Sequence, residues 1–183
     1  MKKTSNVSVV APRSISGFPE WLPEMKILEN RLLNIIRRNY ESFGFVPIET
    51  PAVELREVLT AKGGNEKEIY TLGRLRDAGM SDDTHDLALH FDLTVPLARY
   101  VAQYQRELVF PFRRYQIQKV WRGERPQSGR FREFYQCDID VIGDGTLSLL
   151  TDAEMPAVIY QIFSEINIGP FMIRINNRKI VQG

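Results

Sequence analysis

The stretch from Lys119 to Gly143 holds the residues whose types and spacing are best suited to chemistry. It reads KVWRGERPQSGRFREFYQCDIDVIG, with two strand-like runs around a polar segment, Arg125 to Gly129. This pattern predicts a β-hairpin with a loop of middling length. Because side chains alternate between the two faces of a strand, residue parity sorts them. In the first run parity separates two pairs, Arg122 with Glu124 and Trp121 with Lys119.

The second run of the hairpin has one apolar face and one polar face. The mostly apolar face is expected to pack on a core and carries Phe131, Glu133, Tyr135, Cys137, Ile139 and Val141. The polar face carries Arg130, Arg132, Phe134, Gln136, Asp138 and Asp140. Guanidinium groups bind phosphate oxygens, a flat ring can stack on a base, and an amide with carboxylates suits a cationic ligand. This set fits a nucleotide beside an amino acid, although a polar sheet face can also be merely solvated.

The composition of the whole chain narrows the classes of protein. Its 183 residues have room for one domain with a sizeable core. The net charge of +1 gives no global attraction to nucleic acid, so any such contact must use a local patch. A single cysteine, Cys137, excludes a disulfide framework and is best interpreted as a buried, inert thiol. His85 and His90 have no cysteine nearby, so we expect no metal site.

The N-terminus begins with two lysines but has no apolar run of useful length. It therefore does not resemble a signal peptide, and no later segment is apolar enough to span a bilayer. We expect a cytoplasmic protein that makes no membrane contact. Residues 1–16 are expected to form a flexible tail, as termini often do.

The first half of the chain predicts a helix followed by extended segments. Apolar residues recur at helical spacing over Glu24–Tyr40, which predicts a helix that begins near Pro23 and ends before Gly44. Short extended segments should follow at Phe45–Ile48 and Pro51–Glu54, and then a short helix over Leu55–Thr60. This unit could serve packing alone or form a dimer surface.

The remaining elements predict a mixed fold. Residues 62–86 are rich in glycine and aspartate and should form a mobile loop, with one strand at Glu68–Leu72. The other expected elements are a strand at Leu87–Phe91, a helix at Val95–Tyr104, hairpin strands at Phe112–Arg122 and Arg130–Val141, a helix at Ala153–Ile166 and a strand at Phe171–Ile175. Asp92 and Thr94 lie at a strand-to-helix junction, where either could be only an N-cap. The class is α+β with a largely antiparallel sheet.

Four sequence segments resemble a known family, and they follow one another along the chain in the order that the family has. The sequence Trp121-Arg122-Gly123-Glu124 resembles motif 2 of class II aminoacyl-tRNA synthetases, F/W-R-x-E. The unit from Met25 to Pro51 resembles motif 1. FDLTVPLARY, residues 91–100, and GRFREFYQCDID, residues 129–140, are similar to histidyl-tRNA synthetases. The resemblance implies a mostly antiparallel sheet flanked by helices over residues 17–183, with motif 1 at about 24–51 and motif 2 at about 112–141.

The resemblance also implies a reaction, in which histidine and ATP form histidyl-adenylate and the histidyl group passes to tRNA(His). Arg122 would be the catalytic residue that holds the α-phosphate, where negative charge grows. The rest of the implied ATP site comprises Glu124 at the adenine end, Arg130 at the distal phosphates and Phe134 stacked on adenine. Magnesium would come with ATP, without identifiable protein ligands.

The family pattern implies a histidine pocket next to this ATP site. Asp92 and Thr94 would bind the ammonium of histidine, and Gln136 and Asp140 would complete the pocket. Arg125 and Gln127, in the loop, would touch the acceptor end of the tRNA. The implied partners are L-histidine, ATP, tRNA(His) and a second copy of the chain, bound through motif 1.

The catalytic domain of the family continues well beyond Gly183, the last residue of this sequence. Motif 3 with its ATP-binding arginine, the loop that closes over histidine and the anticodon-binding domain are not recognisable before Gly183. We therefore expect a fragment with an incomplete sheet and weak or no activity. Two other functions stay open. One is the synthetase-like regulatory subunit of ATP phosphoribosyltransferase, in histidine biosynthesis; the other is a non-catalytic scaffold.

Overall fold

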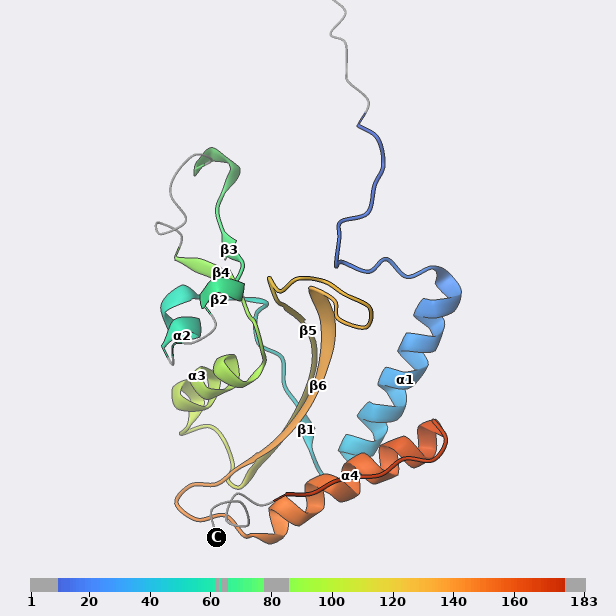
Figure 1. Cartoon of the computed structure of the whole chain (residues 1–183). Coiled ribbons are helices and arrows are strands. Elements are labelled where there is room, and N and C mark those ends of the chain that lie inside the picture. Colours follow the sequence, from blue (N-terminus) through green and yellow to red (C-terminus); the bar gives the residue numbers. More distant parts are fainter. Residues whose placement is uncertain (1–9, 62, 64–65, 78–85, 177–183) are drawn as a thin grey trace, which may run out of the picture.

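An antiparallel hairpin of two ten-residue strands is the centre of the molecule (Figure 1). The structure, a computed structural model, describes residues 10–61, 63, 66–77 and 86–176. Strands β5 (Phe112–Trp121) and β6 (Glu133–Ile142) pair over their full length, from Phe112 opposite Ile142 to Trp121 opposite Glu133. Strand β1 (Val46–Pro47) runs parallel to β5 on its other edge. The predicted hairpin and largely antiparallel sheet are confirmed.

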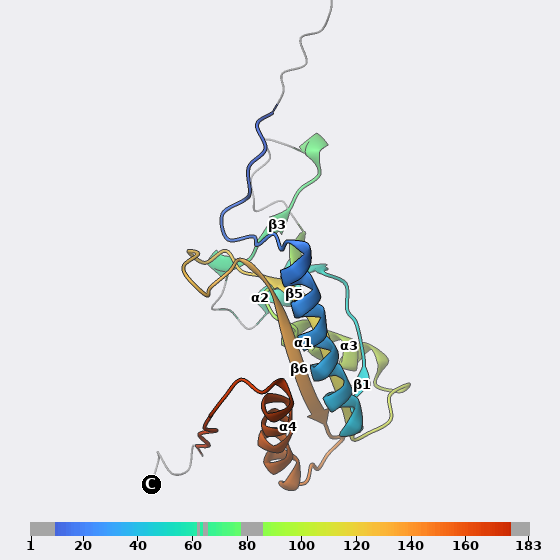
Figure 2. The same ribbon diagram turned by 90° about the vertical axis from the view of Figure 1, so that its right-hand side faces the viewer.

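Two helices cover one face of this hairpin. Helix α1 (Pro23–Ser42) and helix α4 (Leu150–Ile166) lie on the same side of β5 and β6, as the two views together show (Figures 1 and 2). The core between helices and sheet consists of Tyr40, Phe45, Tyr115, Val158 and Ile162. The side chains of Cys137, Ile139 and Val141 pack against this core. The apolar face assigned by parity is therefore the buried one.

A glycine ends helix α1 where the sequence places it. Gly44 adopts a left-handed φ of +77°, a conformation that glycine takes without steric cost. The Gly44 amide donates to the Glu41 carbonyl (3.0 Å), and the Phe45 amide donates to the Tyr40 carbonyl (3.1 Å). These two bonds form the C-terminal closure typical of helices. They direct the chain back along the sheet, so that Phe45 enters the core and β1 follows.

A second, smaller sheet stands on the opposite side of the hairpin. Its order is β2 (Val53–Leu55), β4 (Leu87–Leu89) and β3 (Thr71–Leu72), all antiparallel, and it is flanked by α2 (Arg56–Thr60) and α3 (Thr94–Tyr104) (Figure 1). Two short 3-10 turns, Glu66–Glu68 and Leu75–Asp77, flank β3.

One fully buried histidine joins the small sheet to the hairpin. His90 follows β4, and its Nε2 donates to the Lys119 carbonyl at 2.7 Å. The Trp121 amide donates in turn to the His90 carbonyl at 3.2 Å. The ring centroids of His90 and Trp121 lie 5.4 Å apart. The contact brings the chain after His90, including Asp92, to the polar face of the hairpin.

Several expected boundaries need correction. The strand predicted at Phe171–Ile175 is wrong, because this segment has no ladder partner among the described residues and Phe171 packs its ring on Tyr160 and Phe163 of α4. Helix α4 begins at Leu150 rather than Ala153, and the Leu150 amide donates to Ser148 Oγ at 3.3 Å.

Other boundaries are shorter than expected or fall partly outside the described ranges. The strand expected at Glu68–Leu72 is reduced to Thr71–Leu72. Parts of the expected N-terminal tail and of the 62–86 loop, with His85, lie outside the described residues, and residues 10–15 carry no helix or strand. None of the helices in the described ranges is long and apolar enough to cross a lipid bilayer.

Candidate functional site

The polar face of the hairpin is formed by residues that face each other across β5 and β6. Opposite residues of an antiparallel pair point to the same side of the sheet. The cross-strand pairs on this side are Arg114 with Asp140, Gln116 with Asp138, Gln118 with Gln136 and Val120 with Phe134. This side is opposite the helices α1 and α4. Three ionisable groups, three amides and an aromatic ring thus lie in register along one strip of the sheet.

Arg122 is held at one end of this strip by two aromatic rings. Its guanidinium carbon lies 4.4 Å from the centroid of Phe91 and 5.1 Å from that of Phe134. Its Nε donates to the Phe91 carbonyl at 3.2 Å. Within the described ranges its two terminal nitrogens make no hydrogen bond, so the group keeps donors for an anion. Phe134, expected to stack on adenine, here stacks on Arg122.

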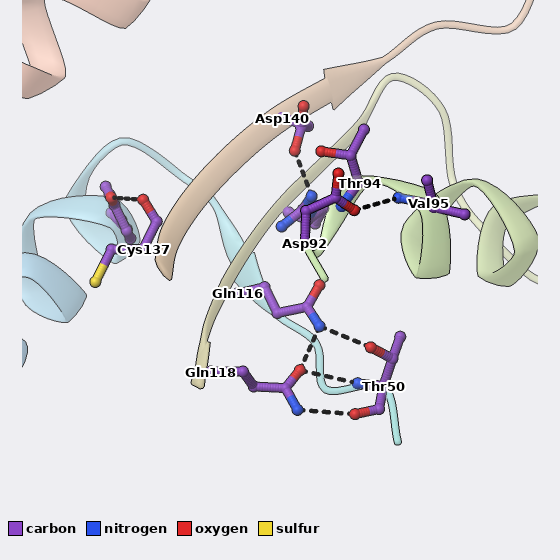
Figure 3. Close-up of polar contacts among 10 residues, drawn as sticks. Thr50, Asp92, Thr94, Val95, Gln116, Gln118, Cys137 and Asp140 are labelled. Carbon is purple, nitrogen blue, oxygen red and sulfur yellow. Dashed lines mark hydrogen bonds and ion pairs between the residues drawn. The ribbon is translucent and has the colours of Figure 1, made fainter. Parts of the chain in front are cut away.

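Asp92 caps helix α3, which is one of the two roles that the sequence left open for this residue. Its Oδ1 accepts from the amides of Thr94 and Val95, both at 3.1 Å. The second carboxylate oxygen takes no part in the cap, so capping and ligand binding are compatible. Figure 3 shows Asp92 and Thr94 on the side of the hairpin from which Asp140 emerges. The structure therefore brings the residues predicted from two separate strings together.

Asp140 forms an ion pair with a buried arginine of the opposite strand. Its Oδ2 contacts Nη2 of Arg114, whose side chain is 0% exposed, whereas that of Asp140 is 42% exposed (Figure 3). Nε and Nη1 of Arg114 have no hydrogen-bond partner among the described residues. The pair therefore extends from the interior of the sheet face to its open side.

Burial determines the acidity of the two aspartates on β6. It raises the pKa of Asp140 above its ordinary value, and the Arg114 guanidinium opposes this shift. The pKa of Asp138 is also raised by burial; Arg114 opposes the shift, and the carboxylates of Asp140 and Asp92 add to it. These carboxylates lie close enough to repel one another, which favours a cationic ligand among them.

Gln136 presents an unused acceptor on the same strip. Its Oε1 is buried and has no hydrogen-bond partner among the described residues. A buried carbonyl oxygen without a donor is costly, so such atoms point to a ligand or to strain. An ammonium group is a donor of the right chemistry for it. Gln136 was predicted as a histidine-pocket residue, and its geometry suits that role.

The floor of the strip is fixed to the segment that follows β1. Gln118 Nε2 donates to the Thr50 carbonyl (2.8 Å), and the Thr50 amide donates to Gln118 Oε1 (3.2 Å). Gln116 Nε2 donates to Thr50 Oγ1 at 2.9 Å (Figure 3). Three hydrogen bonds to one threonine hold both amides still, which keeps the floor rigid.

A separate open cleft lies at the hairpin loop. Its volume is about 560 Å³, and its lining residues are Glu68, Glu124, Arg125, Pro126, Gln127 and Arg130. Arg130 Nη1 pairs with Glu124 Oε2 at 3.1 Å. The four loop residues predicted to contact ATP or tRNA thus gather at one cleft, at the end of the hairpin where Arg122 lies.

Main-chain contacts from two distant segments grip the base of this loop. The Gly123 amide donates to the Glu68 carbonyl at 2.7 Å, and the Arg132 amide donates to the Gly17 carbonyl at 2.7 Å. Arg132 also donates through Nε to the Glu124 carbonyl (3.0 Å) and through Nη1 to the Ser16 carbonyl (3.4 Å). The loop therefore starts from a fixed base.

Sequence reasoning missed part of the site. Arg114, Gln116 and Gln118 were placed in a strand but not on the functional face, and Asp138 was placed on that face without a role. Parity could have found the three β5 residues, because they share it with Arg122. Nothing in the sequence indicated that Glu68 and Gly17 would support the loop.

Two other chemistries find no support in the described part of the chain. Its histidine, cysteine, aspartate and glutamate side chains form no group of three or more that could hold a metal ion. Burial raises the pKa of Cys137 to about 11, so its thiol is a poor nucleophile at neutral pH.

Comparison with known proteins identifies the family of the chain. A family model described as histidyl-tRNA synthetase matches residues 17–183. A histidine–tRNA ligase of Thermobifida fusca is 54% identical over 180 residues, which cover 98% of this chain and 41% of the relative. The chain thus spans about two fifths of the length of that relative.

Solved structures give the same result. A histidyl-tRNA synthetase from Nostoc sp. PCC 7120 is 55% identical, with a TM-score of 0.82 over 93% of this chain and 38% of that one. A protein of Bacillus halodurans described as an ATP phosphoribosyltransferase regulatory subunit/histidyl-tRNA synthetase shares the fold at 22% identity, with a TM-score of 0.71 over 88% of this chain and 40% of that one. Together with the family match over nearly the whole chain, these similarities show that the chain belongs to the histidyl-tRNA synthetase family.

Proposed function

We propose that the full-length protein is a histidine–tRNA ligase. In the first step an oxygen of the histidine carboxylate attacks the α-phosphorus of ATP, and pyrophosphate leaves as histidyl-adenylate forms. In the second step a terminal ribose hydroxyl of tRNA(His) takes the histidyl group, and AMP leaves. The proposal is supported by the family and by relatives named histidine–tRNA ligase.

The single observation that carries the proposal is the restraint on Arg122. The rings of Phe91 and Phe134 and the Phe91 carbonyl fix its guanidinium plane, while its terminal nitrogens stay available. Negative charge grows on the α-phosphate oxygens during attack, and a donor fixed in advance stabilises it without reorganisation. Arginine suits this role because its planar group offers two parallel donors.

ATP would extend from Arg122 towards the loop cleft. Phe134 would offer a ring for adenine, Glu124 would accept from the adenine amino group, and Arg130 would turn from Glu124 to the distal phosphates. The Glu124–Arg130 pair is half exposed, so breaking it costs little. Magnesium would arrive on the phosphates as part of the substrate, and we assign it no ligand in this chain.

Histidine would lie over the strip between Arg122 and Arg114. Its ammonium would meet the free oxygen of Asp92, the hydroxyl of Thr94 and the unpartnered Oε1 of Gln136. Its imidazole would donate to Asp140, which would fix the ring tautomer. Burial raises the pKa of Asp138 and of Asp140, and a positively charged ligand at this place would stabilise both carboxylates.

The remaining contacts belong to assembly and to tRNA. Arg125 and Gln127, both exposed at the loop, would touch the acceptor end of tRNA(His). Helix α1 and the strand after it would form a homodimer interface. A cytoplasmic location goes with this role, since tRNA is charged where it is used.

Histidine-dependent exchange of pyrophosphate into ATP tests the first step without tRNA. We expect exchange with histidine and none with glutamine or lysine, and a loss of roughly 10²–10³-fold for Arg122→Ala. Charging of tRNA(His) then separates a ligase from a regulatory subunit that binds histidine without activating it. Absence of both activities in the full-length protein would refute the proposal.

A further inference from the structure

Two neighbouring arginines of β5 have opposite surroundings. Arg113 points to the helices, where its donors meet Glu154 (2.7 and 3.0 Å) and the Phe43 carbonyl (2.8 Å). Arg114 points to the polar strip, is fully buried, and has one ion-pair partner, Asp140. Its Nε and Nη1 stay unpaired within the described part of the chain. Arg113 is thus satisfied by the fold, whereas Arg114 is not.

Arg114 is a poor choice if stability alone is required. Removing a guanidinium from water is costly, and a single carboxylate partner rarely compensates for it. An apolar side chain of similar volume would pack at this place at least as favourably. A fully buried cation in contact with a half-exposed carboxylate does, however, set the direction and the charge of that carboxylate. Asp140 keeps one oxygen on Arg114 and has the other for a ligand.

We propose that Arg114 is a positioning residue of the histidine pocket, which holds the Asp140 carboxylate in the orientation and charge state that the imidazole of histidine requires. The inference rests on the proposed function and deepens it. Arg114 touches no substrate in this arrangement; it acts through Asp140.

The charged groups around Asp140 define the pH dependence that follows. Arg114 attracts it from β5, Asp138 is its like-charged neighbour on β6, and Asp92 and Arg122 face Asp138 from the α3 junction and the end of β5. Tyr40 approaches Arg114 from α1. Burial raises the pKa of Asp140 and Arg114 lowers it. Without Arg114 the carboxylate would take up a proton at higher pH and would no longer accept from the imidazole.

The test compares the KM for histidine and the KM for ATP in pyrophosphate exchange, from pH 5.5 to 8.5, on the full-length protein. The variants are Arg114→Gln, Arg114→Lys and the matched control Arg113→Gln. We expect Arg114→Gln to raise the histidine KM about 10- to 100-fold, the loss typical of one charged hydrogen bond, with little change in the ATP KM. Its acid limb should move to higher pH. Arg114→Lys should restore part of the affinity and the parent pH profile.

The control separates positioning from stability. Arg113→Gln should lower the melting temperature and leave the histidine KM and its pH profile unchanged, because its partners lie on the helix side. If Arg114→Gln does not fold, Arg114→Lys decides, because it keeps the charge but not the fork. A parent pH profile in Arg114→Gln would overturn the inference alone, and so would a histidine KM in Arg114→Lys that equals the parent value or changes no more than its ATP KM. A parent protein without histidine-dependent exchange would overturn the proposed function with it.

Discussion

Gln136 and Asp140 differ in what they do for the folded chain besides any role in ligand binding. Gln136 Oε1 is a buried acceptor without a partner among the described residues, so Gln136→Ala removes an unfavourable group and should lower the free energy of unfolding by no more than about 0.5 kcal/mol. Asp140 is the ion-pair partner of buried Arg114. Although burial raises the pKa of Asp140, its removal leaves the buried guanidinium without a counter-charge, so Asp140→Asn should destabilise the chain by about 1–3 kcal/mol. Both variants should weaken histidine binding.

Thermal unfolding with and without millimolar histidine checks this difference. The parent should gain stability from the ligand by mass action, and both variants should lose most of that gain. Only Asp140→Asn should melt earlier without ligand. A shift as large as that of the parent in either variant would remove that residue from the proposed pocket.

The contribution of Asp138 to the stability of the folded chain depends on pH. Its pKa in the folded chain is raised, so the folded state holds the proton more tightly than the unfolded state. The stability contributed by this group is fully present below the unfolded pKa, about 4, and is lost as pH rises through the folded pKa. Asp138→Asn escapes that loss. We therefore expect the variant to be more stable than the parent at pH 7–8, and the difference to vanish near pH 4.

Urea denaturation at several pH values measures this effect, with the exposed Asp144→Asn as control. A variant less stable than the parent at neutral pH would mean that the attraction between Asp138 and Arg114 outweighs the burial of the carboxylate. A gain in stability at neutral pH would instead mark Asp138 as a residue kept at a cost, as functional residues often are.

Side-chain parity explains how much of the site could be predicted at this scale. Counting by twos places Gln136, Asp138 and Asp140 on one face, and the structure confirms that face. Counting cannot show that Arg114 is fully buried, because its burial depends on elements that are distant in sequence. It also cannot show that Arg122 lies between Phe91 and Phe134, since that contact requires the segment after β4 to meet the end of the hairpin.

At the scale of elements, helix α4 stabilises the fold through one face. Ile162 is buried in the core with Tyr40 and Tyr115, whereas Ile159 on the same helix is 42% exposed. Ile162→Ala should therefore lower the free energy of unfolding by about 2–5 kcal/mol, and Ile159→Ala by no more than about 0.5 kcal/mol. Denaturant titrations of both variants measure the two losses in the free energy of unfolding. Equal losses would show that the exposed face of α4 is also covered in solution.

Elements with local signals were predicted well, and elements that depend on partners were not. Proline at the start and Gly44 at the end delimit α1 within two residues. The segment at Phe171–Ile175 has the apolar composition of a strand, but a strand needs a neighbour to accept its hydrogen bonds, and composition does not provide one. The same reason explains why Glu68–Leu72 yields only a two-residue strand.

At the scale of the whole molecule, helix α1 leaves apolar side chains on the surface. Met25, Ile27 and Leu28 are each about half exposed or more. Clusters of this kind often mark an interface, and a two-fold dimer is the commonest closed assembly. We expect a homodimer at micromolar concentration in sedimentation equilibrium, and Ile27→Lys should shift it towards monomer. Leu75→Lys, at an exposed position far from α1 in sequence, is the control. A monomeric parent would contradict the expected interface.

The two N-terminal residues that contact the base of the hairpin loop differ in which side chains they tolerate. Ser16 contributes only its carbonyl, so any side chain could stand there. Gly17 has a φ of +84°, and a Cβ at this position would lie 2.9 Å from Cγ and Cδ of Arg132. Natural variation should therefore be free at one position and confined to glycine at the next. Although Gly17 is far from the hairpin loop in sequence, its restriction to glycine follows from its contact with Arg132 at the base of that loop.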